Sequence, residues 1–559
     1  MIPQRDLDRF KEIFKKGKLL LFDLSENAAA NRRASIPKFM QLKEEVEKGI
    51  SCSQGQNTMH QLLLAFTLRY LGYAYLACRE ANKAEATSKE CIELMKSKNI
   101  EMDSIIPYVQ SMIDLIINYN ERKMYKKSID YLTKAEGVCK KFEEGNYNPL
   151  TINEILDGCT ESQSGQGRTE FNRLYTDCTD YLALTYRALD NWKKYFEYSY
   201  VSLKRSSKVR PYDDCLLAKK CTKFSDYFIK QNMFGEARRY LAAATYFITE
   251  YKEKNASFLL DTSKETELKK TLAKLGMGWG KYGLSLLLAS MERGKRGDDY
   301  NFAENFKALK IEQDMPFLFP DLQLDSYEKD IQTDYCRSFK DAKRIYLHLI
   351  KWLAIPKEFY RPKDLQVYAD VMKDFARLYH YVAYFEENPS NKFKMHKLRC
   401  KYLEEILKLI DSIIFLPISR ECWTEAGFSY LERLQIIKQS LIGKEITSED
   451  VNKIHVLALK GMKHFQNIIS SYRHKESDLW IPNMTENDKK YLMISLSNMA
   501  QLHSAIISSD EPDHLSKCLY YHRTFILECS CDKQLSIELA EQIAHSKKEI
   551  YRLEKKYAL

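Results

Sequence analysis

The sequence predicts an all-α protein built as a solenoid of tetratricopeptide-like helical hairpins. Only 19 Gly and 13 Pro occur in 559 residues, and the Asn-Gly signal of a tight β-hairpin is absent, which argues against a strand-and-turn fold. The chain is 45% apolar and 29% charged, a balance typical of a folded protein. Its length exceeds what one compact core normally serves, so we expect two domains or an extended array.

The strongest pattern lies in two consecutive helical hairpins over residues 175–247. Apolar and small residues recur there three, four and seven apart, which predicts one buried face on each helix. In each of four hairpins, two positions are expected to meet: one on the first helix, usually occupied by a small residue, and one on the packing side of the second helix. They are 12 residues apart every time: 72 and 84, 116 and 128, 183 and 195, 225 and 237. Such a shared register is typical of tetratricopeptide repeats. The hairpins are spaced by 44, 67 and 42 residues, so we expect longer helices or loops than in the simple repeat of about 34 residues.

The remaining elements follow in order along the chain. Two short amphipathic helices are expected over 4–17 and 35–49, separated by an Asn/Ala/Arg-rich connector, and a long loop over 143–169 interrupts the first array. One long helix is predicted over 265–293, followed by a polar, acidic segment over 294–329. Helices are then predicted over 333–354, 363–386, 391–415, 418–441, 447–472, 486–508, 513–529 and 533–556. Prolines 356, 362, 389, 417 and 482 are expected between these helices, where proline costs no helical hydrogen bond.

These elements predict four regions. Residues 1–58 form N-terminal helices, 59–252 an N-terminal repeat array, 253–332 a long linker helix with an acidic loop, and 333–559 a C-terminal repeat-like array. Stacked hairpins of this kind bury each pair only against its neighbours and leave a long binding groove.

Charge and cysteine usage favour a cytosolic binding protein. The net charge is +10, from 87 basic and 77 acidic residues that interleave along nearly every helix, so no basic stripe of the kind nucleic-acid binders carry is evident. Neither a signal-peptide core nor an apolar run long enough to span a bilayer is found. The 14 cysteines show no framework spacing and are interpreted as reduced thiols.

Two motifs fit a cofactor or metal on letters alone. Residues 278–283 match G-x-G-x-x-G, but they lie inside a predicted helix with no strand before it, whereas a dinucleotide site requires one. We therefore expect these glycines at helix contacts. Cys518, His522, Cys529 and Cys531 lack the paired spacing of a structural zinc site. No catalytic signature is found, so we predict a protein that is not an enzyme and needs no cofactor.

The activity that remains is binding of a partner. Aromatic and basic residues lie where the groove helices and hairpin loops of the second half of the first array should be. The candidates are Tyr181, Lys204, Arg205, Thr222 and Lys223. For each of them a packing role is an open alternative; Tyr181 directly precedes the Leu182–Ala183 packing position.

The same block resembles the KIF-binding protein family of kinesin regulators. The resemblance rests on residues 171–247, above all Leu203-Lys204-Arg205 and Phe234-Gly235-Glu236-Ala237-Arg238. A second match is Tyr384-Phe385-Glu386-Glu387, followed by Lys394-Met395-His396-Lys397-Leu398-Arg399. It extends, with gaps, from about residue 60 to the C-terminus.

The resemblance implies a crescent of two solenoid subdomains joined by a linker helix. It also implies a monomer in the cytoplasm, associated with the cytoskeleton, that binds kinesin motor domains in its groove and blocks their attachment to microtubules. No nucleic acid, membrane insertion or cofactor is implied. Tyr181 matches a contact residue of the family, while Ser206 and Lys223 occupy contact positions with a different residue type.

Two alternatives stay open. A repeat adaptor that clamps an acidic C-terminal peptide would place Lys and Asn where this chain has Arg69 and Tyr73, so only the basic half of the clamp is present. Direct binding of nucleic acid or microtubules through basic surface would be strongly salt-dependent. A motor's basic microtubule-binding face also requires acids in the groove despite the net charge of +10; the acidic stretch over 299–334 is one candidate source.

Overall fold

A computed structural model provides the structure of the chain. It describes residues 4–23, 25, 27–52, 58–97, 104–145, 147–157, 159, 165–208, 213–255, 262–296, 317–361, 363–474, 479–506 and 512–557. The described residues form helices and no named strand, with one isolated bridge between Arg473 and Trp480. The all-α prediction is therefore confirmed. None of the described helices has the combination of length and apolar character that a membrane span requires.

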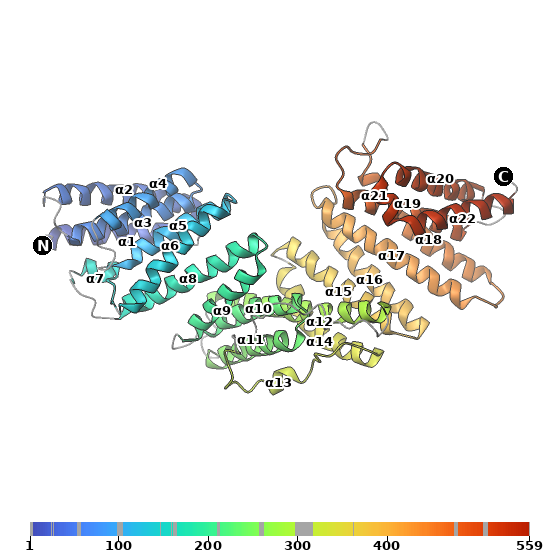
Figure 1. Cartoon of the computed structure of the whole chain (residues 1–559), viewed down its shortest axis with the longest axis horizontal. Coiled ribbons are helices and arrows are strands. Elements are labelled where there is room, and N and C mark those ends of the chain that lie inside the picture. The colour runs from blue at the N-terminus through green and yellow to red at the C-terminus, as the bar shows by residue number, and fades with distance from the viewer. Residues whose placement is uncertain are drawn as a thin grey trace. The chain divides into compact units, whose positions relative to one another are not determined.

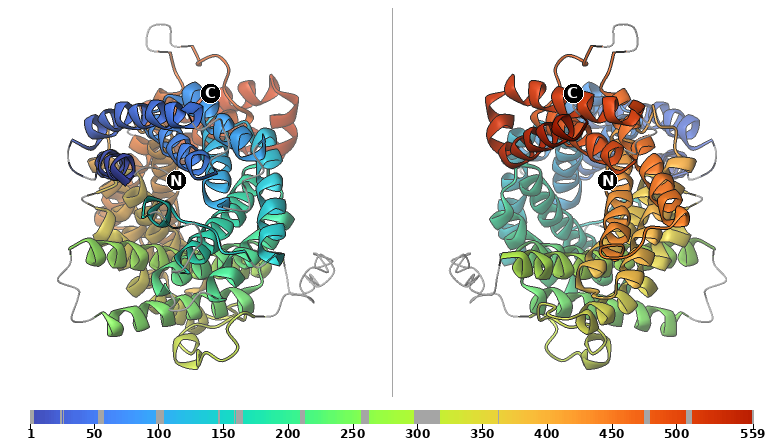
Figure 2. Two further views of the ribbon diagram at one scale, coloured as in Figure 1. Left: turned by 90° about the vertical axis from the view of Figure 1, so that its left-hand side faces the viewer. Right: turned by 90° about the vertical axis from the view of Figure 1, so that its right-hand side faces the viewer.

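The chain divides into two compact units. Unit 1 comprises residues 1–220 and 311–320, and unit 2 comprises 221–310 and 321–559. The boundary falls inside one helix, α10, between Lys220 and Cys221. Within each unit, many helices that follow one another in the chain lie side by side, such as α3 and α4 in unit 1 and α17 and α18 in unit 2 (Figures 1 and 2).

Unit 1 contains the first two predicted helices and three of the four predicted hairpins. Its helices are α1 (Gln4–Leu21), α2 (Ala28–Cys52), α3 (Thr58–Ala77), α4 (Ala81–Ser97), α5 (Ile105–Glu121), α6 (Tyr125–Glu144), α7 (Ile152–Leu156), α8 (Gln166–Ala188) and α9 (Trp192–Lys208), followed by the start of α10 (Asp214–Lys230). The expected connector before residue 35 is wrong, because α2 already begins at Ala28. Its Ala-Ala-Ala-Asn-Arg-Arg start is rich in good helix formers.

Unit 2 contains the remaining helices. They are α11 (Phe234–Lys254), α12 (Thr262–Arg296), α13 (Asp325–Glu328), α14 (Phe339–Tyr360), α15 (Leu365–Phe385), α16 (Pro389–Leu409), α17 (Leu416–Ser440), α18 (Ser448–Ser471), α19 (Glu486–Ile506), α20 (Pro512–Ser530), α21 (Lys533–Glu538) and α22 (Ala540–Tyr557). The long predicted helix over 265–293 lies within α12, which packs against α11, α14 and α15. Most of the expected acidic segment after it, residues 297–316, lies outside the described residues.

The hairpin register predicted from the sequence reappears in the turns. Each of the four hairpins turns through a residue with positive φ, which follows position 72, 116, 183 or 225 by seven residues. These residues are Arg79, Lys123, Asp190 and Asn232. Each turn also closes with a hydrogen bond between backbone groups five residues apart, from the amides of Glu80, Met124, Asn191 and Met233 to the carbonyls of Tyr75, Tyr119, Tyr186 and Phe228. This is the six-to-one bond of a Schellman helix end, so one turn geometry fixes all four pairs.

The glycines of the G-x-G-x-x-G match serve helix packing. Gly278 and Gly280 lie in α12, where an added Cβ would be 2.7 Å from Thr222 Cγ2 and 2.5 Å from Leu353 Cδ2 respectively. No strand precedes them among the described residues. Close helix approach, and not phosphate binding, accounts for these glycines.

One of the predicted proline boundaries is wrong. Pro356 lies inside α14. Proline leaves the carbonyl four residues earlier without its helical hydrogen bond, and this carbonyl, Trp352 O, would lie 2.5 Å from a Cβ added at Gly276. The interruption is therefore placed where α14 passes closest to α12. Pro389 and Pro417 begin α16 and α17 as expected.

The cysteines whose side chains are described are free thiols, and most of them are buried in helix interfaces. Burial raises the pKa of the Cys91, Cys422, Cys518 and Cys529 thiols to about 12. These thiols are therefore protonated at neutral pH and behave as small apolar side chains.

Candidate partner-binding face

The first helices of the hairpins in unit 1 form a layer of their own. α3 packs against α5, and α5 packs against α8, in addition to their hairpin partners. No comparable packing joins the described residues of α4 and α6, the second helices of two of these hairpins. Unit 1 therefore curves with α3, α5 and α8 on the inside, as helical-repeat arrays do.

We call the solvent side of this layer the inner face. It carries Arg69 and Tyr73 from α3, Ile117 from α5, and Asp177, Tyr181 and Leu184 from α8, while Asp114 of α5 is buried beneath Arg69. The rings of Tyr73 and Tyr181 and the side chain of Ile117 are half-buried against the core of unit 1, and Leu184 is exposed. Aromatic and apolar groups thus alternate with charged ones across three helices, a mixture typical of protein-binding surfaces.

Arg69 and Asp114 form a long ion pair on this face. Arg69 Nε lies 3.9 Å from Asp114 Oδ2, and the guanidinium also stacks over the rings of Tyr70 and Tyr73, at 4.4 and 5.5 Å from their centroids. Asp114 is 2% exposed. Burial raises the pKa of its carboxyl to about 6, and Arg69 offsets only part of that effect.

Tyr181 lies at the edge of the core with its hydroxyl unused. No hydrogen bond joins this hydroxyl to another described residue. Burial, together with the nearby carboxylates of Asp177 and Asp114, raises the pKa of Tyr181 to about 12. One turn before Tyr181, Asp177 has a weak partner, Arg173, at 3.5 Å. The surroundings of Tyr181 are therefore locally acidic.

The three other candidates in unit 1 lie on α9 and differ in exposure. Lys204 is exposed. The Arg205 guanidinium lies 3.5 Å from the centre of the Tyr175 ring and 3.1 Å from Glu143 Oε1, so it ties α9 to α8 and α6. Ser206 is buried, and its hydroxyl donates to the Ser202 carbonyl at 3.0 Å. Arg205 and Ser206 thus have packing roles in this structure.

Thr222 and Lys223 belong to unit 2, on the second half of α10. Thr222 is buried, with its methyl group against Gly278 of α12, whereas Lys223 is exposed. The six candidate residues are thus divided between two units, and as a set they stay a prediction. Asp114 and Asp177 were not among the residues predicted from the sequence. The signal that could have identified them is an acidic residue on the packing side of the first helix of a hairpin.

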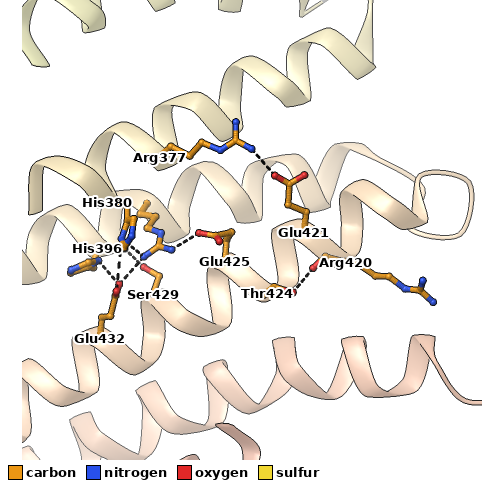
Figure 3. A network of polar contacts seen from close by, with 10 residues as sticks. Arg377, His380, His396, Arg420, Glu421, Thr424, Glu425, Ser429 and Glu432 are labelled. Carbon is orange, nitrogen blue, oxygen red and sulfur yellow. Dashed lines mark hydrogen bonds and ion pairs between the residues drawn. The ribbon is translucent and has the colours of Figure 1, made fainter. Parts of the chain in front are cut away.

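A second group of polar residues joins α15, α16 and α17 in unit 2 (Figure 3). Arg399 is at its centre: Nη1 lies 2.7 Å from Glu432 Oε2 and 3.0 Å from His380 Nδ1, and Nη2 pairs with Glu425. His396 Nδ1 lies 2.9 Å from Glu432 Oε2. Burial and the Arg399 charge lower the pKa of His380 to about 4, so this imidazole is neutral at pH 7.

His380, His396 and Glu432 are the one group of three potential metal ligands found in the described part of the chain. The Arg399 guanidinium, 3% exposed, contacts both Glu432 and His380. A cation in that position satisfies the carboxylate and repels a metal ion. The arrangement therefore fits an arginine-centred ion network that holds three helices together. The group does not include the cysteines considered above, of which Cys518 and Cys529 are buried and Cys531 is exposed.

A family model described as "KIF-1 binding protein C terminal" matches residues 217–554. The chain belongs to the KIF-binding protein family. Curated relatives extend the similarity over nearly the whole sequence. A KIF-binding protein of Drosophila melanogaster is 29% identical over 574 residues, covering 97% of this chain and 95% of the relative. Those of Gallus gallus and Homo sapiens are 25% and 22% identical, covering 88% of this chain in both cases and 86% and 83% of the relatives.

These comparisons confirm the resemblance to the KIF-binding protein family. The family match begins in α10 and includes the α15–α17 network, whose His396 and Arg399 come from the Lys394–Arg399 segment quoted for that resemblance. Among solved structures, the Cut9–Hcn1 tetramer is 11% identical with a TM-score of 0.24, covering 93% of this chain and 95% of that chain, which is too distant to inform the assignment.

Proposed function

We propose that this protein binds kinesin motor domains through the inner face of unit 1 and thereby prevents their attachment to microtubules, without catalysing a reaction. Membership of the KIF-binding protein family supports a kinesin partner. A helical-repeat array that presents a mixed apolar and charged surface is suited to gripping another protein.

The observation that carries this proposal is the environment of Tyr181. Its hydroxyl has no described hydrogen-bond partner, and its ring stands between apolar groups and the carboxylates of Asp114 and Asp177. A motor surface that holds acidic tubulin is basic, so a locally acidic contact area complements it even though the whole chain carries +10. Lys204, exposed on α9 of unit 1, is proposed as a further contact of the motor, and Lys223, exposed on unit 2, is proposed as a separate one.

The alternative, a repeat adaptor that clamps acidic peptide termini, is less well supported. Its basic group would be Arg69, which stacks on Tyr70 and Tyr73 and is paired with Asp114. A peptide carboxylate at this position would meet the Asp114 carboxylate. We further propose that the protein acts as a monomer in the cytoplasm, associated with the cytoskeleton through the motor, and does not bind nucleic acid.

Microtubule co-sedimentation with purified kinesin motor domains and a non-hydrolysable ATP analogue tests the proposal. The protein is expected to move the motor from the pellet to the supernatant in proportion to its concentration. If every motor of a broad panel still pellets, the proposal is wrong. Pelleting of the protein without any motor would instead favour the basic-surface alternative.

Substitutions then test the inner face. Tyr181→Ala is expected to weaken motor capture at least about tenfold, because an aromatic anchor of an interface contributes on the order of 2 kcal/mol. Tyr131→Ala is the matched control: Tyr131 is also half-buried against the core of unit 1, but it lies on α6, outside the inner face. Equal losses in both variants, or loss of helical circular dichroism in the Tyr181 variant, would assign Tyr181 to packing.

A further inference from the structure

A pocket of about 320 Å³ lies within unit 2, apart from every candidate residue considered above. Residues of α11, α12, α13 with the segment after it, and α14 line it. The lining residues that matter below are Trp279, Asp330, Arg344, His348, Lys351 and Trp352. Its volume is at the lower end of the range for ligand pockets, enough for one large side chain. We call it the tryptophan pocket.

The floor of the tryptophan pocket is aromatic and held in place. Trp279 is 1% exposed and donates from Nε1 to Thr245 Oγ1 at 3.1 Å. Trp352 stacks on it with ring centres 6.1 Å apart, and His348 meets it edge-on at 4.9 Å. Trp279 is buried and holds the other two rings in place, and the half-buried rings of Trp352 and His348 present the flat surface. Rings fixed in this way lose little conformational entropy when a planar group binds.

His348 adds a polar group that the fold leaves unused. Its Nε2 is buried and has no hydrogen-bond partner in the described part of the chain. Burial lowers the pKa of His348 to about 4, so the ring is neutral at pH 7 and each nitrogen either donates or accepts one hydrogen bond. A buried polar atom without a partner costs free energy, and a ligand that reaches it would recover that cost.

The rim of the pocket is net positive. Arg344 and Lys351 are exposed there, and so is one acidic residue, Asp330. None of the three forms a hydrogen bond or an ion pair with another described residue. Leu347, 52% exposed, adds apolar surface at the same rim. Asp341, three residues before Arg344 on α14, offsets part of the Arg344 charge. Lys351 and the rest of the Arg344 charge favour an anionic group beside the aromatic floor.

We propose that the tryptophan pocket binds an aromatic side chain of a partner polypeptide that has acidic residues next to it. The aromatic ring stacks on Trp352 and hydrogen-bonds His348 Nε2 when it carries an N–H or O–H group. The neighbouring carboxylates pair with Lys351 and Arg344. None of the residues that line the pocket belongs to the inner face of unit 1.

Isothermal titration of the full-length protein with three capped peptides tests the proposal. The first peptide carries one tryptophan between two glutamates on each side, the second has alanine in place of the tryptophan, and the third has lysines in place of the glutamates. The first is expected to bind with a dissociation constant below about 1 mM. The alanine peptide is expected to bind at least about tenfold more weakly, and the lysine peptide should not bind measurably.

Two variants locate the binding. Lys351→Glu is expected to weaken the first peptide about two- to fivefold, as one exposed ion pair does, and Trp352→Leu should abolish binding. Lys343→Glu is the matched control, an exposed lysine on the same helix outside the pocket. Since Lys351 and Lys343 are both exposed, folding is not at stake in that comparison.

The proposal is overturned if the first peptide does not bind, if the alanine or lysine peptide binds equally well, or if Lys343→Glu weakens binding as much as Lys351→Glu. Displacement of the peptide by ATP at equal concentration would also overturn it, because the pocket would then be a nucleotide site. In the microtubule co-sedimentation assay, the Lys351→Glu variant is expected to release the motor from the pellet as the wild type does.

Discussion

Arg69 Nε lies 3.9 Å from Asp114 Oδ2, and neither atom has a hydrogen-bond partner among the described residues. A pair this long returns only part of the free energy that Asp114 loses on leaving water. The inner face of unit 1 therefore has beneath it a carboxylate whose ionisation opposes folding, at the position where the chain is proposed to meet a basic partner.

The first prediction concerns the pH dependence of stability. The pKa of Asp114 is about 6 in the folded chain and about 3.9 when unfolded. Between these values the folded state holds the proton more tightly, so the free energy of unfolding falls as pH rises from about 4 to 6, by at most about 3 kcal/mol. Asp114→Asn is expected to reduce this fall, measured by urea unfolding at pH 4.5 and 7.

The exposed residue Asp130, on α6, provides the control for this experiment. Asp130→Asn should leave the pH dependence unchanged. Some slope should remain in the Asp114 variant, because burial also raises the pKa of Asp374 in unit 2 to about 6. A slope identical to that of the wild type would contradict the assignment of a raised pKa to Asp114.

The second prediction concerns the arginine at the centre of the α15–α17 network. Arg399→Met removes the cation that Glu425 and Glu432 share. The expected loss is about 2–4 kcal/mol, below the extreme for a fully buried pair because both carboxylates are a third or more exposed. Arg377→Met, which breaks more exposed contacts of α15 with Glu421 of α17 and with Asp374 of its own helix, should cost about 1 kcal/mol. Comparable losses in thermal unfolding would show that the network has no special role.

The third prediction concerns the positive-φ residue of a hairpin turn. Lys123 is exposed and has φ 58°, a conformation that costs a residue with a Cβ about 1 kcal/mol. Lys123→Gly is expected to stabilise the chain by about 0.5–1 kcal/mol, since relief of that strain outweighs the added freedom of the unfolded chain. Lys123→Ala keeps the strain and should give no such gain. A lower melting temperature for the glycine variant would contradict the turn geometry.

The fourth prediction compares two helical glycines. A Cβ at Gly276 would lie 2.5 Å from the Trp352 carbonyl oxygen, which is backbone and cannot easily move, whereas a Cβ at Gly137 meets nothing within 4 Å. Gly276→Ala is expected to destabilise by about 1–3 kcal/mol through overpacking. Gly137→Ala should instead stabilise by up to about 1 kcal/mol through helix propensity. If both variants melt above the wild type, α12 and α14 are not in close contact at this position.

Local sequence signals predicted most of the fold. Hydrophobic spacing located most helices of both units, although some ends differ by six or seven residues and the loop expected over 143–169 contains the short helix α7. The shared offset between small and packing positions recurs as one turn geometry at Arg79, Lys123, Asp190 and Asn232. These features depend on neighbours in the chain. Pro356 was placed wrongly because its position inside α14 is permitted by contact with Gly276, 80 residues earlier, and no local rule reports such a contact.

The candidate site was harder to predict for the same reason. Tyr181 and Lys204 reach solvent, but Ser206 and Thr222 are buried, since the side of the helix that a residue occupies in three dimensions is decided by packing against α8 and α12. Asp177 belongs to the inner face, and Asp114 lies beneath it, only because α3, α5 and α8 lie in one layer. The tryptophan pocket joins residues from four elements and has no pattern in the sequence.

The distribution of thiols offers a practical route to these measurements. A maleimide dye reacts with the thiolate form, which is scarce wherever burial has raised the pKa of the thiol, as at Cys91 and Cys529. Among the described cysteines, Cys531 alone is exposed. Brief treatment near neutral pH should label Cys531, directly after α20, ahead of these buried thiols, and so report on the end of α20 by fluorescence anisotropy.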